Sequence, residues 1–184
     1  MEAYNFISFP RSGSHYLNNV LRTYLGGQKQ YTKYISHDHD EFLRVKEKGS
    51  LYLKRDKLNT AYSYLMATYD LQNKEVINFK EYEPWVLGCL LRISEHRKFY
   101  LSHSSKIVEY DLLISSSAEE LWPSILFFFG LDFVQSKMEE AINQNSKERL
   151  AEKIDSPYMN KKMLSKSYQS NRVLFTEYFA GVPL

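Results

Sequence analysis

The chain has 184 residues, of which 43% are hydrophobic and 25% charged, and these proportions are typical of a globular protein with a sizeable core. Its 24 basic and 22 acidic residues give a formal net charge of +2, which is too balanced to favour nucleic acid as the main partner. A basic pocket for one anionic ligand remains compatible with this charge. We see no internal repeat or linker, so we expect a single domain over residues 1–184.

Membrane and secretion signals are not evident in the sequence. No apolar run approaches about 18 residues, so we expect no membrane span. No charged segment followed by a long apolar segment precedes the first predicted strand, so we expect no signal peptide. Cys89 is the single cysteine, which excludes an intramolecular disulfide and fits a reducing compartment. We therefore expect a cytoplasmic location.

The first part of the chain has a strand–turn–helix pattern. Aromatic and β-branched residues predict a buried strand over Tyr4–Phe9, which Pro10 ends because proline has no N–H to donate. After the turn at Ser12–Ser14, apolar residues recur at helical spacing over Tyr16–Leu25. Free amides and the helix dipole make such a turn an anion-binding design, and Arg11 adds a full charge. The pattern predicts a phosphate or sulfate cradle, and an ordinary turn with a solvated arginine is the alternative.

The rest of the chain alternates between strand and helix patterns. Further strands are predicted at Gln30–Ser36, Ser50–Lys54 and Lys106–Tyr110. Helices are predicted at Glu41–Lys48, Leu58–Tyr69, Phe79–Leu101 (which Pro84 could break), Ala118–Phe129 (if Pro123 falls in its first turn), Val134–Asn145, Glu148–Lys153 and Asn171–Phe179, with a loop at Asp111–Ser117. Strands separated by helices indicate parallel pairing. We therefore expect an α/β fold, in which a parallel β-sheet of about four to five strands is flanked by helices on both faces.

Polar residues follow several of the predicted strands. Arg11, His37 and Arg55 each come just after a strand, and Tyr110 ends the fourth strand. Ligands of parallel sheets bind at the carboxyl ends of the strands. We therefore expect these side chains to converge on one site.

The segments FPRSGSHYL, LYLKRDKLNTAYSYL and IVEYDLLISSSAEELWPSILFFFGL together resemble a known family, the PAPS-dependent sulfotransferases. FPRSGSHYL is similar to the family's 5′-phosphosulfate loop, and LYLKRDKLNTAYSYL is similar to its 3′-phosphate segment, in which Arg55 and Ser63 keep the family spacing of eight residues. IVEYDLLISSSAEELWPSILFFFGL resembles the family's Y-E-D-L segment and the helix that follows it. The resemblance covers most of residues 4–131 and implies the P-loop-like sulfotransferase fold.

This resemblance implies a function and a set of site residues. The family moves a sulfuryl group from 3′-phosphoadenosine 5′-phosphosulfate (PAPS) to an acceptor, releases PAP and needs no metal. We expect a hydroxyl or amine acceptor on a small molecule or glycan, whose identity the sequence leaves open, as it does the oligomeric state. The donor-binding residues implied are Arg11, Ser12, Gly13, Ser14, His15, Tyr16, Arg55, Ser63 and Tyr110.

Two residues are implied in catalysis. Arg11 would stabilise the charge on the leaving phosphate. His37 lies in YISH, which resembles the family's K-T-H segment, and would take the acceptor's proton, because histidine titrates near neutral pH. His39 is the rival base, and Asp38 or Asp40 could orient either ring or accept the proton. A metal site in this cluster is disfavoured, because adjacent residues rarely all reach one ion.

The sequence also departs from the family pattern. His15 stands where the family has threonine or serine, and Lys57 replaces the usual proline. The R-K-G segment that closes over the 3′-phosphate is missing, and Arg172 or Lys161–Lys162 could replace it. These departures leave open a non-catalytic nucleotide-binding or interaction domain of the same fold. A P-loop kinase is weaker, because no Lys-Ser/Thr follows Gly13.

Overall fold

The computed structural model describes residues 4–38, 49–115, 117, 119–146 and 166–182. Within this part of the chain, the sheet has four parallel strands in the order β2-β1-β3-β4. Their bounds are β1 Tyr4–Ser8, β2 Ile35–Asp38, β3 Ser50–Lys54 and β4 Lys106–Glu109. The structure confirms the predicted α/β class with a parallel sheet. Because all strands run the same way, their carboxyl ends share one edge.

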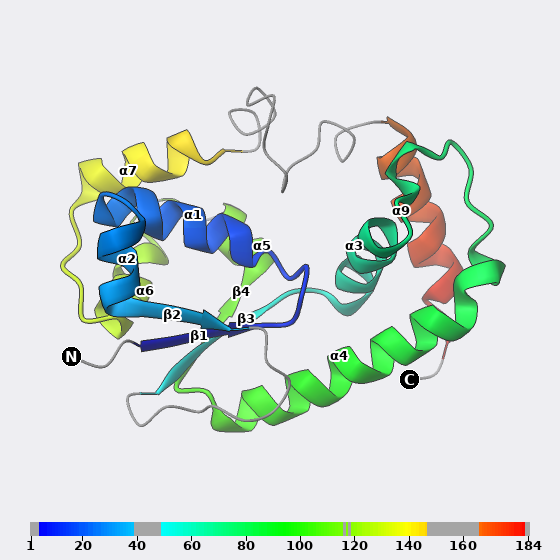
Figure 1. The fold of residues 1–184 in the computed structure, drawn as a ribbon, viewed down its shortest axis with the longest axis horizontal. Coiled ribbons are helices and arrows are strands. Elements are labelled where there is room, and N and C mark those ends of the chain that lie inside the picture. The colour runs from blue at the N-terminus through cyan, green and yellow to red at the C-terminus, as the bar shows by residue number, and fades with distance from the viewer. Residues whose placement is uncertain (1–3, 39–48, 116, 118, 147–165, 183–184) are drawn as a thin grey trace.

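Helices lie on both faces of this sheet, as predicted (Figure 1). α1, α2, α6 and α7 lie on one side, and the long helix α4 runs along the other. α3 packs beside both α4 and α9. The bounds are α1 Ser14–Leu25, α2 Gln28–Tyr34, α3 Lys57–Thr68, α4 Glu83–His103, α5 Tyr110–Ser115, α6 Trp122–Phe128, α7 Gln135–Gln144 and α9 Lys166–Phe179, with short 3-10 turns η1 Leu71–Asn73 and η2 Phe79–Tyr82.

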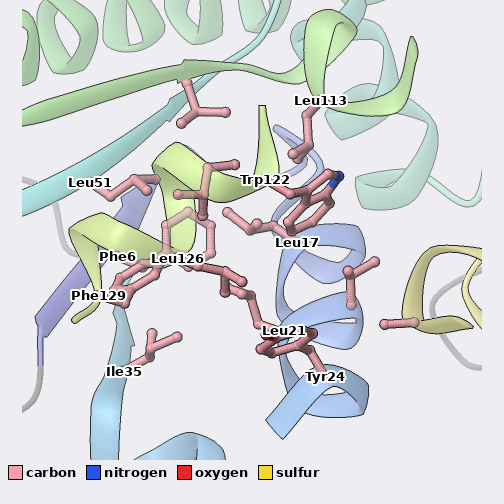
Figure 2. Packing of buried hydrophobic residues seen from close by; sticks show 14 of the residues in the cluster. Phe6, Leu17, Leu21, Tyr24, Ile35, Leu51, Leu113, Trp122, Leu126 and Phe129 are labelled. Carbon is pink, nitrogen blue, oxygen red and sulfur yellow. The ribbon is translucent and has the colours of Figure 1, made fainter. Parts of the chain in front are cut away.

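Alternating strand residues divide the core between the two faces. Phe6 and Leu51 belong to a large cluster with Leu17 of α1 and Trp122 of α6, all fully buried (Figure 2). On the other face, Ile7 and Tyr52 pack against Tyr100 of α4. A separate cluster joins α3, α4 and α9, and its buried members include Phe9, Ala61, Tyr62, Leu65, Val86, Leu90, Ile93, Phe175 and Phe179. Phe9, in the loop after β1, thus packs into this cluster between α3, α4 and α9.

The second predicted strand is wrong over most of its length. Residues 28–34 form the helix α2, and the strand begins only at Ile35. The β-forming residues Tyr31, Thr32 and Tyr34 suggested a strand. Tyr31 is instead buried against α1, where its hydroxyl donates to Oδ1 of Asn18. Tertiary packing therefore overrides local propensity here.

Smaller corrections concern where helices begin. The predicted loop at 111–117 is largely the short helix α5, and Tyr110 opens that helix rather than ending β4. Pro84 does not break α4, because it lies in the first turn, where proline costs no hydrogen bond. Pro123 likewise lies in the first turn of α6, which begins later than expected, and α9 begins earlier. The predicted helices at 41–48 and 148–153 lie outside the described residues.

None of the helices in the described residues has both the length and the apolar character needed to cross a membrane.

Candidate anion-binding site

The loop between β1 and α1 has an unusual backbone. Arg11 and Gly13 both adopt left-handed conformations, with φ of 67° and 93°. This conformation is costly for arginine, and such strain concentrates at functional sites. α1 then begins at Ser14 without a side-chain cap, so its first amides have no acceptor within the helix. An uncapped helix start of this kind attracts anions.

The residues predicted to line the loop differ in their backbone hydrogen bonds and in the burial of their side chains. The amide of Ser12 donates to the carbonyl of Phe9 at 3.2 Å, and the amide of Tyr16 donates to the carbonyl of Gly13 at 3.0 Å. These bonds shape the turn, and within the described residues the amides of Gly13 and Ser14 have no backbone acceptor outside the helix. The side chains of Ser12 and Ser14 are buried, and that of His15 is exposed. Burial, together with the nearby Tyr110, raises the pKa of Tyr16 to about 12.

Arg55 joins this loop to the end of β3. Its Nη1 donates to the carbonyl of Arg11 at 3.0 Å. Its guanidinium carbon lies 4.9 Å from the ring centroid of Tyr110, a cation–π distance. The Tyr110 ring also packs closely against Gly13. The predicted convergence of Arg11, Arg55 and Tyr110 at the sheet edge is therefore observed.

Two acidic residues near the end of β3, Glu109 and Asp56, have partners other than Arg55. Oε1 of Glu109 pairs with Nζ of Lys54 at 2.6 Å. Oδ1 of Asp56 accepts from the amide of Asn59 at 2.8 Å and caps α3. Within the described residues, Arg55 has no carboxylate within ion-pair distance, and its Nε is buried without a hydrogen-bond partner. A buried N–H of this kind is stabilised by an acceptor, which an anion would supply.

Arg11 adds a second positive charge beside that of Arg55. Burial lowers the pKa of Arg11, Tyr168 raises it, and the like charge of Arg55 lowers it again. In the part of the chain that the structure describes, no acidic side chain forms an ion pair with Arg11. Two neighbouring arginines without an acidic partner among the described residues suit an anion, because arginine binds phosphate and sulfate oxygens through parallel hydrogen bonds.

Arg97 of α4 supports Arg55 from below the sheet. Its Nη2 donates to the carbonyl of Arg55, and its guanidinium also hydrogen-bonds the hydroxyl of Tyr52. Burial raises the pKa of Tyr52 to about 12, and Arg97 opposes that rise. The Tyr52 hydroxyl lies 3.2 Å from Nδ1 of His96, also on α4. The sequence analysis missed Arg97, because no motif or spacing links it to the end of β3.

Ser63 is a buried residue of α3, and its role in the site stays a prediction. It is 7% exposed, and its hydroxyl is hydrogen-bonded to the hydroxyl of Tyr168 on α9. Burial raises the pKa of Tyr168, and the bond to Ser63 and the charges of Arg55 and Arg11 oppose that rise. Tyr168 is thus a second residue that the sequence analysis missed, because it lies beyond the segments that resemble the family.

His37 lies in β2 rather than in a loop after it. Its ring stacks on Phe6 with centroids 4.6 Å apart, and its Nε2 is 3.3 Å from Oγ of Ser8 at the end of β1. The half-buried ring is therefore beside the base of the loop and one strand removed from β3. His39, Asp40 and the side chain of Asp38 lie outside the described residues. Among the described residues, no group of three or more histidine, cysteine or acidic side chains could hold a metal ion.

A solved structure has the same fold. The chain resembles the crystal structure of mouse sulfotransferase SULT7A1 complexed with PAP, with a TM-score of 0.63 over 98% of this chain and 84% of that chain. The two sequences are 14% identical. The fold of this chain is therefore a sulfotransferase fold. No protein-family model matches the sequence, and no curated protein matches it.

We predict that Gly13→Ala destabilises the protein more than Gly26→Ala. Both glycines have positive φ, 93° and 80°, so both substitutions incur the left-handed strain of about 1–2 kcal/mol. A Cβ at Gly13 would also overlap the Tyr110 ring, whereas one at Gly26 meets nothing within 4 Å. We expect an additional loss of about 1–3 kcal/mol for Gly13→Ala in urea unfolding. Equal losses for the two variants would contradict the tight packing of Tyr110 on the loop.

Proposed function

We propose that the chain is a sulfotransferase that transfers the sulfuryl group of PAPS to a hydroxyl or amine of a small-molecule or glycan acceptor and releases PAP. The observation that carries this proposal is the pair Arg11 and Arg55, which lie together at the carboxyl edge of a sulfotransferase fold without an acidic partner among the described residues. We treat residues 1–184 as one domain in this proposal. The buried single cysteine, Cys89, supports a reducing, cytoplasmic location.

PAPS has two separated anionic ends, and the site offers two sets of hydrogen-bond donors. Arg11 and the amides of Gly13 and Ser14 suit the 5′-phosphosulfate. Arg55 and Ser63 suit the 3′-phosphate, and the unpartnered Nε of Arg55 is available for one of its oxygens. A ligand with a single phosphate would engage only one of these sets.

The proposed reaction is an in-line displacement at sulfur. The bond from sulfur to the bridging oxygen of the 5′-phosphate breaks as the acceptor oxygen or nitrogen bonds to sulfur. The acceptor proton passes to His37, and Arg11 stabilises the negative charge that develops on the leaving phosphate. The residues in this proposal supply charge and a base, and no metal ion takes part.

The second candidate function is nucleotide binding without catalysis. The surroundings of His37 favour it, because the ring stacks on Phe6 and Nε2 is already close to Ser8. To act as a base, His37 must exchange the contact with Ser8 for the acceptor hydroxyl. His15, in place of a hydroxyl residue, also supports this candidate.

The donor assignment predicts a ranking of ligands. PAP should raise the melting temperature by mass action, equivalent to about 2.7 kcal/mol at 100 times its Kd, and ATP with Mg²⁺ should raise it much less. Arg55→Ala should weaken PAP binding at least about tenfold in calorimetry, because hydrogen bonds to charged groups are lost. Arg92→Ala, which removes an exposed arginine from α4, is the control and should bind normally. Stronger stabilisation by ATP with Mg²⁺ would contradict the proposal in favour of a kinase.

Replacing His37 separates the two candidate functions. With labelled PAPS and an acceptor found by screening, His37→Ala should lower turnover by about 10²–10⁴-fold and leave PAP affinity unchanged, because a general base contributes a factor of this size. His103→Ala removes an exposed histidine at the end of α4 and should leave turnover intact. Full activity of His37→Ala would move the base to another residue. Absence of turnover in the unaltered protein across a broad acceptor screen would favour binding without catalysis.

A further inference from the structure

Tyr168 reaches the anion site from the first turn of α9. It is 7% exposed, and its ring packs on that of Tyr62 of α3, with centroids 5.0 Å apart. The hydroxyl of Tyr62 donates to the backbone carbonyl of Tyr168 at 2.7 Å. Tyr62 therefore fixes both the ring and the backbone of Tyr168, and the position of the Tyr168 hydroxyl is well defined.

The hydroxyl of Tyr168 lies among the residues proposed to bind PAPS. It is hydrogen-bonded to Ser63 and interacts electrostatically with both Arg55 and Arg11. Two positive charges and a hydroxyl act together on this oxygen, and the same groups would stabilise an anionic ligand oxygen placed beside it. Arg172, one turn further along α9, adds a third positive charge that acts on Tyr168.

We propose that Tyr168 is a specificity-determining residue whose hydroxyl hydrogen-bonds the 3′-phosphate of the bound nucleotide. This inference rests on the proposed function and extends it. Bound beside Ser63 and Arg55, the phosphate accepts a hydrogen bond from the Tyr168 hydroxyl. A nucleotide without a 3′-phosphate gains nothing from this hydroxyl, so Tyr168 selects for nucleotides that carry the phosphate.

The hydroxyl of Tyr168 is in the protonation state that a hydrogen-bond donor needs. Burial raises its pKa above the ordinary value for tyrosine, so the hydroxyl is protonated at neutral pH. A protonated hydroxyl donates to phosphate without adding negative charge. α9 would thereby supply contacts that the missing R-K-G segment would otherwise make, through the hydroxyl of Tyr168 and the charge of Arg172.

The test compares two nucleotides and two tyrosine variants. Tyr168→Phe keeps the ring against Tyr62 and removes only the hydroxyl. In calorimetric titrations it should weaken PAP binding about tenfold or more and leave the affinity for adenosine 5′-monophosphate, which has no 3′-phosphate, unchanged. Tyr178→Phe removes another hydroxyl from α9, one that pairs with Glu83 at 3.0 Å, and should change neither affinity.

Three results would overturn the inference while leaving the proposed function in place. The first is an unchanged PAP affinity in Tyr168→Phe. The second is an equal loss of affinity for both nucleotides, which would indicate a structural role. The third is tighter PAP binding, which would indicate that the hydroxyl competes with the ligand. Failure of the unaltered protein to bind PAP would instead overturn the proposed function and this inference with it.

Discussion

The hydrogen bond from Arg55 to the main-chain carbonyl of Arg11 joins the two loops that carry these like charges at the edge of the sheet, and the charge of Arg55 acts on Arg11. Their mutual repulsion is unfavourable, and burial increases that cost for Arg11. No acidic side chain offsets it among the described residues. An arrangement that places two cations together without a counterion suits an anionic ligand, since such a ligand relieves the repulsion when it binds.

The rest of the structure keeps these two residues in place. β1 and β3 are neighbours in a parallel sheet, so the loops that carry Arg11 and Arg55 leave the same edge. Tyr110 contacts both Gly13 and the Arg55 guanidinium, which limits movement of both loops. Arg97 holds the backbone of Arg55 from α4 on the opposite face. The site is thus preorganised by elements from both layers of helices, and that reduces the entropy lost when a ligand binds.

The sequence predicted the secondary structure of the segments that carry the proposed site residues, because that structure depends on local signals. Arg11, Arg55 and Ser63 lie within short strand–turn–helix segments, in which β-branched runs, Pro10 and helical spacing mark each boundary. The sequence could not predict Tyr168, because it reaches the site only through the packing of α9 against α3.

Packing also explains the errors in secondary structure. Residues 28–34 contain β-forming tyrosines and a threonine, and only the burial of Tyr31 against α1 makes them a helix. Arg97 carries no sequence signal for a similar reason, because its contact with Arg55 depends on how α4 crosses beneath β3. Long-range contacts of this kind decide the structure where local propensities are ambiguous.

The central claim is that Arg11 and Arg55 serve two ends of one nucleotide. A crystal structure of the protein soaked with PAP tests it most directly. We expect the 5′-phosphate at the amides of Gly13 and Ser14 beside Arg11, and the 3′-phosphate against Arg55 and Ser63. PAP bound away from this loop, or with neither phosphate on an arginine, would show that the two arginines do not bind one nucleotide.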